Sequence, residues 1–208
     1  MKTSIASLIL ALVLPSLATA ERISLFDGKT FAGWEGDTNK TWRIVDGAIV
    51  GGNLKAGKVP HNEFICTKRQ FTNFILRVKF KLVGTEGFVN GGVQFRSQRV
   101  PNHFEVSGYQ ADMGDGWWGC LYDESRRNKV LVKPDAETVN KALKKGEWND
   151  YEIRCEGKQI RLAINGTQTV DYTEADEKIP SFGILGMQVH GGGITEAYYK
   201  DISIEPLP

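Results

Sequence analysis

Cysteine is scarce in this sequence, and the few cysteines that occur follow no metal-binding spacing. Only Cys66, Cys120 and Cys155 are found among 208 residues. Three are too few for a disulfide-built scaffold, and the lack of CxxC and HExxH patterns excludes the common structural zinc sites. Each cysteine lies in an apolar, strand-like run, so we expect buried thiols. The alternative is one disulfide between two of them, which would leave the third thiol free.

An excess of charge of one sign is also lacking. The chain carries 26 Lys and Arg against 25 Asp and Glu, a formal net charge of +1. Its neighbouring basic residues alternate with apolar residues or flank acids, whereas nucleic-acid binding needs clustered positive charge. We therefore expect no nucleic-acid partner.

A hydrophobic run long enough to cross a bilayer, about 20 residues, is missing as well. The N-terminus instead has a positive start, an apolar run over 5–14 and the cleavage pattern Ala18-Thr19-Ala20, which are the parts of a secretory signal peptide. We expect residues 1–20 to be removed and 21–208 to form one domain. The protein is then exported, to the periplasm or the cell exterior, with no membrane anchor after cleavage.

Helical periodicity is nearly absent, and a period of two dominates. Apolar and charged residues alternate over 74–82 and 151–156, and Asn165-Gly166 predicts a tight hairpin. Only 135–145 predicts a helix. Further strands are expected at 41–46, 48–51, 63–67, 91–97, 103–113, 117–122, 129–133, 160–164, 167–170, 182–190 and 195–205. The chain has 23 glycines, which favour turns between these strands. The pattern predicts an all-β fold, a two-sheet antiparallel sandwich or jelly roll.

Several predicted strands carry amide, imidazole and carboxylate groups opposite their apolar residues. The residues that share such faces are Gln94 with Arg96, Gln110 with Asp112, and Gln188 with His190, and Glu105 is placed similarly. An ordinary solvated face would carry more Lys and Glu. The pattern suits a face that hydrogen-bonds the hydroxyl groups of a carbohydrate. The alternative is an ordinary exposed sheet face.

Two adjacent tryptophans lie in the glycine-rich stretch 114–119. Neighbouring residues of a strand point to opposite faces, so we expect one of Trp117 and Trp118 to fill the core and the other to face a sugar ring. The alternative places both rings in the core. The remaining tryptophans are expected to be core residues: Trp34, Trp42 and Trp148.

Seven motifs, in order, resemble those of the 3-keto-disaccharide hydrolase domain family. They include LFDGKTFAGW at 25–34, NGGVQFR at 90–96, GYQAD at 108–112, GEWN at 146–149 and GMQVH at 186–190. The resemblance covers about 25–206. It implies a concanavalin A-like jelly roll, exported in bacteria, that cleaves glycosides already oxidised to a ketone at carbon 3.

The resemblance also implies roles for particular residues. Asp112 and His190 are the expected acid/base pair, Glu105 is a reserve base or metal ligand, and Arg96 would stabilise the ketone or enolate oxygen. The side chains expected to hold the sugar are Gln94, Gln110, Gln188, Trp118, Tyr122 and Arg127. The resemblance implies no definite cofactor, and a divalent metal held by His190 with Asp112 or Glu105 is an option. The order of residues 104–110 departs from the family pattern, so either Glu105 or Gln110 takes its acidic position.

Two other functions compete with this interpretation. A jelly roll hosts many lectins, so a non-catalytic sugar-binding module is the main alternative. A laminarinase-type glucanase would need an E-x-D-x-x-E strand, which this sequence does not contain. The natural substrate and the oligomeric state are not predicted by the sequence.

Overall fold

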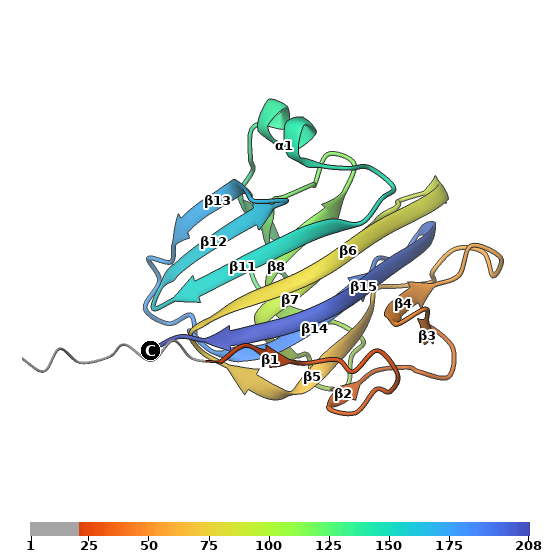
Figure 1. Ribbon diagram of the computed structural model, residues 1–208, viewed down its shortest axis with the longest axis horizontal. Helices are drawn as coiled ribbons and strands as arrows, with labels where there is room; N and C mark the ends of the chain where they lie inside the picture. Colours follow the sequence, from red (N-terminus) through yellow and green to blue (C-terminus); the bar gives the residue numbers. More distant parts are fainter. Residues whose placement is uncertain (1–20) are drawn as a thin grey trace, which may run out of the picture.

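The computed structural model describes residues 21–208, and the predicted signal peptide, residues 1–20, lies outside the described residues. The described chain forms strands almost throughout, with one short helix (Figure 1). The elements are β1 (Ile23–Ser24), β2 (Trp34–Glu35), β3 (Trp42–Val45), β4 (Ala48–Gly52), β5 (Glu63–Phe71), β6 (Phe74–Gly87), β7 (Asn90–Arg99), β8 (Val106–Gly114), β9 (Leu121–Glu124), β10 (Lys129–Val132), α1 (Ala136–Ala142), β11 (Asn149–Glu156), β12 (Gln159–Ile164), β13 (Thr167–Thr173), β14 (Gly183–Val189) and β15 (Gly193–Pro206).

The strands form two antiparallel sheets stacked in two layers (Figure 1). One, here the outer sheet, has the order β13-β12-β11-β6-β15-β4-β3, with β1 paired to β15. The other, here the site sheet, has the order β10-β9-β8-β7-β14-β5-β2. The long alternating strand β6 lies at the centre of the outer sheet, between β11 and β15. The predicted two-sheet sandwich is therefore confirmed.

The core lies between the two sheets because each strand turns its apolar residues inward. Phe80 of β6 and Phe95 of β7 are fully buried, as is Trp42, and they belong to one hydrophobic cluster. Trp34 is buried as predicted. Trp148 is not a core residue: it is only partly buried, and the ammonium groups of Lys81 and Lys200 lie over its ring.

The glycine-rich stretch after β8 is a turn, and this corrects the strand predicted at 117–122. The amides of Trp117 and Trp118 both donate to the carbonyl of Gly114, so the chain curls back before β9 begins at Leu121. The helix is shorter than predicted and is capped by Asp135, whose carboxylate accepts from the Thr138 amide. Among the described residues, no helix has the length and apolar character needed to span a membrane.

The three cysteines are free and buried, as the preferred interpretation of the sequence predicted. Burial disfavours the thiolate and raises the pKa of Cys66 to about 12 and that of Cys120 to about 11. These thiols therefore act as small apolar core groups.

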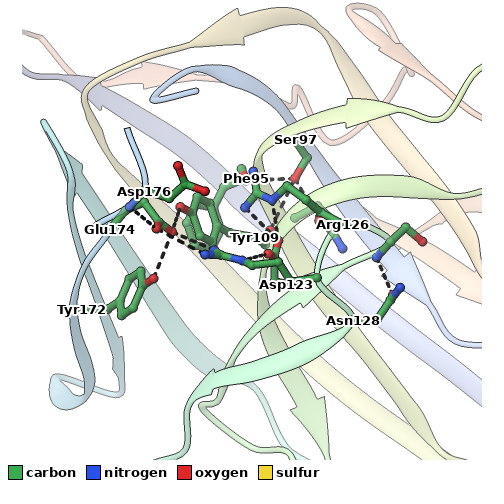
Figure 2. A network of polar contacts seen from close by, with 12 residues as sticks. Phe95, Ser97, Tyr109, Asp123, Arg126, Asn128, Tyr172, Glu174 and Asp176 are labelled. Carbon is green, nitrogen blue, oxygen red and sulfur yellow. Dashed lines mark hydrogen bonds and ion pairs between the residues drawn. The ribbon is translucent and has the colours of Figure 1, made fainter. Parts of the chain in front are cut away.

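A network of ion pairs fastens the turn that follows β9 (Figure 2). Asp123 has no exposed side-chain surface and is paired with Arg126 at 2.8 Å and with Arg127. Arg127 also binds Glu174 at 2.7 Å, and that carboxylate accepts from the Tyr109 hydroxyl at 2.6 Å. The network ties β9 to β8 and to the segment after β13, and so fixes the strand that carries part of the site described next.

Candidate functional site

A small pocket lies on the face of the site sheet that points away from the core. It measures about 80 Å³. Its lining comes from neighbouring strands and the loops at their ends: Phe88, Asn90, Gln110, Asp112, Trp117, Tyr122, Glu124 and His190. The strand register brings the polar members together, since Gly92 pairs with Asp112 and Gln110 pairs with Tyr122. We call this the site pocket.

Asp112 is the buried carboxyl group of the site pocket, with 2% of its surface exposed. Its Oδ1 accepts hydrogen bonds from Asn90 Nδ2 at 3.3 Å and Gln110 Nε2 at 3.2 Å. Burial raises the pKa of Asp112 to about 8 despite these two donors. The group is therefore mostly protonated at neutral pH and can donate a hydrogen bond or a proton to a ligand.

Glu124 is a second carboxyl group in the pocket, and the sequence interpretation missed it. Burial, followed by repulsion from the neighbouring Glu105 carboxylate, raises its pKa to about 7. Gln188 Nε2 donates to its Oε2 at 3.1 Å. The alternation of residues 122–124 was a usable signal, because it places Glu124 on the same face as Tyr122.

His190 supplies an imidazole to the site pocket. Its Nδ1 lies 2.7 Å from the carbonyl oxygen of Gly191, and because that oxygen can only accept, Nδ1 carries the proton. In the neutral ring, Nε2 is then the nitrogen with a free lone pair. Asn62 holds this turn, since its Oδ1 accepts from the Gly191 amide at 3.0 Å while its Nδ2 donates to Glu105 at 3.0 Å.

Aromatic rings form the walls of the pocket. The Trp117 and Tyr122 ring centroids are 5.7 Å apart, and Phe88 lies edge-on to Trp117 at 6.3 Å and to His190 at 4.6 Å. Aromatic faces beside hydrogen-bonding groups suit the apolar C–H face of a sugar ring.

Trp118, which the sequence predicted to hold a sugar, does not line the site pocket; its neighbour Trp117 does. Residues 114–119 form a turn, so strand alternation does not apply to them. The Trp118 ring instead packs on Phe80, with 6.3 Å between centroids, and its Nε1 donates to Asp115 at 3.0 Å.

Arg96 does not share a face with Gln94, which corrects the expectation that its guanidinium meets a substrate oxygen. A β-bulge shifts the pairing of β7 with β8 between Phe95 and Gln98, and Arg96 has a φ of 46°. Its guanidinium therefore turns away and donates to the carbonyl oxygens of Thr72 and Gly157 at 2.8 and 2.7 Å. It closes turns at the far end of the sheets.

Arg127 also lies outside the site pocket. Its guanidinium forms ion pairs with Asp123 and Glu174, so the prediction that it holds sugar hydroxyls is wrong. Glu105 lies beside the pocket rather than in its wall, bound to Asn62 and to the Ser125 hydroxyl.

Two predicted ligand-binding amides lie beneath the pocket. Gln94 and Gln188 are fully buried. Gln94 Nε2 donates to Gln110 Oε1 at 2.8 Å, which directs the Gln110 amide nitrogen towards Asp112. Gln188 supports Glu124 in the same way. They orient the residues that face the pocket.

The three side chains considered for a divalent metal do not form a metal site. Asp112 and His190 line the site pocket, but Glu105 is bound elsewhere. Within residues 21–208, no three His, Cys, Asp or Glu side chains gather as a group that could hold an ion. These residues do not fit the metal, and the chemistry below is derived without one.

The raised pKa of Asp112 predicts a pH-dependent stability. Its pKa increases from 3.8 to about 8 on folding, so the folded state keeps a proton that the unfolded state has lost. The resulting stabilisation is complete below pH 4 and is lost as the pH rises to 8. We expect Asp112→Asn to reduce the fall in unfolding free energy over this window by up to about 1.4 kcal/mol per pH unit.

Urea unfolding at a series of pH values measures this slope. Asp171→Asn is the matched control, because Asp171 is a solvent-exposed carboxylate paired with Arg161. An Asp112→Asn slope equal to that of the wild type would contradict the burial effect.

Comparison with known proteins agrees with the fold and with a family. The family of 3-keto-alpha-glucoside-1,2-lyase-like domains matches residues 21–205, which confirms the resemblance seen in the sequence motifs. No curated protein matches the chain significantly.

Solved structures of similar fold include hydrolase-like and sugar-binding proteins. A candidate glycosyl hydrolase from Parabacteroides distasonis ATCC 8503 superposes with a TM-score of 0.65 at 21% identity, over 90% of this chain and 94% of that one. The carbohydrate-binding module CBM66 from Bacillus subtilis gives 0.64 at 15% identity, over 83% and 95%. A legume lectin-like domain from Entamoeba histolytica gives 0.58 at 12% identity, over 95% and 100%. These likenesses confirm the predicted jelly-roll fold.

Proposed function

The chain belongs to the 3-keto-alpha-glucoside-1,2-lyase-like domain family, and from that premise we propose that it cleaves glycosides carrying a ketone at carbon 3. A ketone at this position acidifies the hydrogen on carbon 2, so a side-chain base can remove it while the substituent on carbon 1 leaves. The enzyme then needs one base, one acid and one hydrogen-bond donor for the enolate oxygen. Because the sequence predicts a signal peptide at residues 1–20, we propose that the protein acts outside the cytoplasm.

The site pocket offers a group for each of these tasks. His190 Nε2 takes the proton from carbon 2, the bond between carbon 1 and the leaving oxygen breaks, and the electron pair of the C–H bond becomes the new C1=C2 double bond. Glu124, with a pKa of about 7, gives its proton to the leaving oxygen, because an acid with a pKa near the working pH transfers protons best. Addition of water across the double bond completes hydrolysis; without it the enzyme is a lyase.

Asp112 takes the task first assigned to Arg96. Its pKa of about 8 keeps it protonated through the reaction at neutral pH, so its hydroxyl can donate a hydrogen bond to the oxygen on carbon 3 as negative charge develops there. The buried amides of Asn90 and Gln110 hold the carboxyl in place from its other oxygen. The observation that carries the proposal is a pair of carboxyl groups with raised pKa values, Asp112 and Glu124, beside an imidazole whose Nε2 is not used by the Gly191 contact, all in one aromatic-walled pocket.

A sugar-binding module without turnover is the second candidate. The CBM66 module superposes almost as well as the hydrolase-like protein, with TM-scores of 0.64 and 0.65. The same aromatic walls and amides would then hold a sugar, and the carboxyl groups would act only as hydrogen-bond donors.

An assay with a chromogenic glucoside oxidised at carbon 3 separates the two candidates. We expect release of the chromophore from the oxidised glucoside and none from the unoxidised one, whose carbon-2 hydrogen is not acidic. A parallel assay with a chelator should leave the release unchanged, because none of the proposed roles uses a metal ion. Binding of both glucosides with no release from either would refute the enzyme and support the module.

A further inference from the structure

A second and larger cavity lies directly beside the site pocket. It measures about 540 Å³ and is bounded by the hairpin that joins β6 to β7, the turn at 115–118 and the loop at 145–146. Its lining includes Gly84, Thr85, Phe88, Asp115, Trp118 and Lys145. Phe88 belongs to both walls, so the two spaces are separated by one partly exposed aromatic ring.

The volumes of the two spaces indicate that they bind different parts of one ligand. Pockets that enclose a small molecule usually measure about 300–1,000 Å³, and the site pocket, at about 80 Å³, can surround only the reacting edge of one sugar ring. The neighbouring cavity, at about 540 Å³, is large enough for a further ring. A two-part ligand would thus fill both spaces across Phe88.

The tryptophan pair connects the two spaces. Trp117 lines the site pocket and Trp118, the next residue in the same turn, lines the neighbouring cavity. Trp118 is held in place, since one side of its ring packs on Phe80 and its Nε1 donates to Asp115. A fixed, partly exposed indole is a suitable platform for a sugar ring.

The charged groups of the neighbouring cavity do not suit acid/base chemistry. Asp115 pairs with Lys145 at 2.7 Å, and Glu86 pairs with Lys58 at 2.9 Å. Both pairs lie at the surface and neither carboxylate is buried. This space can therefore bind part of a ligand, while the reacting groups remain in the site pocket.

We propose that the neighbouring cavity binds the leaving-group half of the substrate, a second sugar ring that lies on Trp118. This rests on the proposed function, which puts the oxidised ring in the site pocket. Trp118 then determines specificity for the leaving group without taking part in bond cleavage.

The test compares two substrates with the same oxidised ring, methyl 3-keto-glucoside and a glucose disaccharide oxidised at carbon 3. We expect Trp118→Ala to raise KM for the disaccharide about 10-fold, the loss of one aromatic contact, and to leave KM for the methyl glycoside within about two-fold. Thr85→Trp adds bulk at the exposed rim without touching the core and should act in the same direction.

Trp148→Ala is the matched control, because it removes a partly buried indole from the surface of the other sheet, and both KM values should stay at the wild-type level. Equal losses on both substrates, or unchanged KM for the disaccharide in both test variants, would overturn the proposal.

A binding experiment keeps this proposal separate from the activity. Titration of the wild-type protein with the unoxidised glucose disaccharide should shift the amide NMR signals of residues 84–89 and 115–118, and Trp118→Ala should weaken that binding. This result would support the neighbouring cavity as a sugar site even if no oxidised glucoside is cleaved. Shifts confined to other regions, or binding that Trp118→Ala leaves unchanged, would overturn it.

Discussion

Replacing Asp123 by alanine is expected to lower the free energy of unfolding by about 3–5 kcal/mol, because it leaves buried charge without a partner. Asp123 is completely buried and balances the guanidinium groups of Arg126 and Arg127. Without it, Arg127 keeps only Glu174, and the Arg126 guanidinium, which lies over the Tyr109 ring, loses its carboxylate. Denaturant unfolding at neutral pH measures the effect.

The control for this prediction is an ion pair of the same chemistry at the surface. Asp171 pairs with Arg161 at 3.3 Å, and both side chains are 40% or more exposed. Asp171→Ala should cost less than about 1 kcal/mol. Similar losses of unfolding free energy in the two variants would contradict the view that the network stabilises the fold because its charges are buried.

Removing either proton-transfer group should reduce the turnover of an oxidised glucoside by about 10²–10⁴-fold. His190→Ala deletes the base, and Glu124→Gln keeps the shape of the acid but cannot release a proton. Both changes are expected to act mainly on kcat, because the aromatic walls and Asp112 still bind the ring. Steady-state kinetics on the 3-keto-glucoside measure the loss.

Two further measurements distinguish a lost proton-transfer group from a damaged fold. Added imidazole should restore part of the activity of His190→Ala, since the small base can enter the space left by the ring. Glu137→Gln alters an exposed carboxylate on α1 and should behave as the wild type. Unchanged kcat in both His190→Ala and Glu124→Gln would refute the assigned roles.

The sequence predicted the sandwich well because strand alternation depends on local pattern. The same alternation correctly placed Gln110 and Asp112 on one face of their strand. Gln110 pairs there with Gln94 and Tyr122 of the two neighbouring strands. It failed at Arg96, because a bulge forms only when two strands pair and cannot be seen in one strand alone.

Other predictions failed because contacts between distant parts of the chain determine where a side chain lies. Residues 114–119 form a turn, so the alternation of a strand does not apply to them, and Trp117 lines the site pocket. Arg127 was expected to hold a sugar, but Glu174, 47 residues further along the chain, binds its guanidinium. The pKa of Asp112 follows from complete burial, which no short sequence pattern reveals.

The protonation states in the site pocket have an electrostatic consequence. The proposed reaction starts with protons on Asp112 and Glu124 and a lone pair on His190 Nε2, a state in which these three side chains hold no net charge. When His190 gains a proton as Glu124 gives one away, a cation and an anion appear together and the sum stays at zero. Water-poor surroundings penalise an isolated ion far more than a matched pair. Asn62 supports the His190 end of this exchange through its hydrogen bond with the Gly191 amide, and Gln188 supports the Glu124 end.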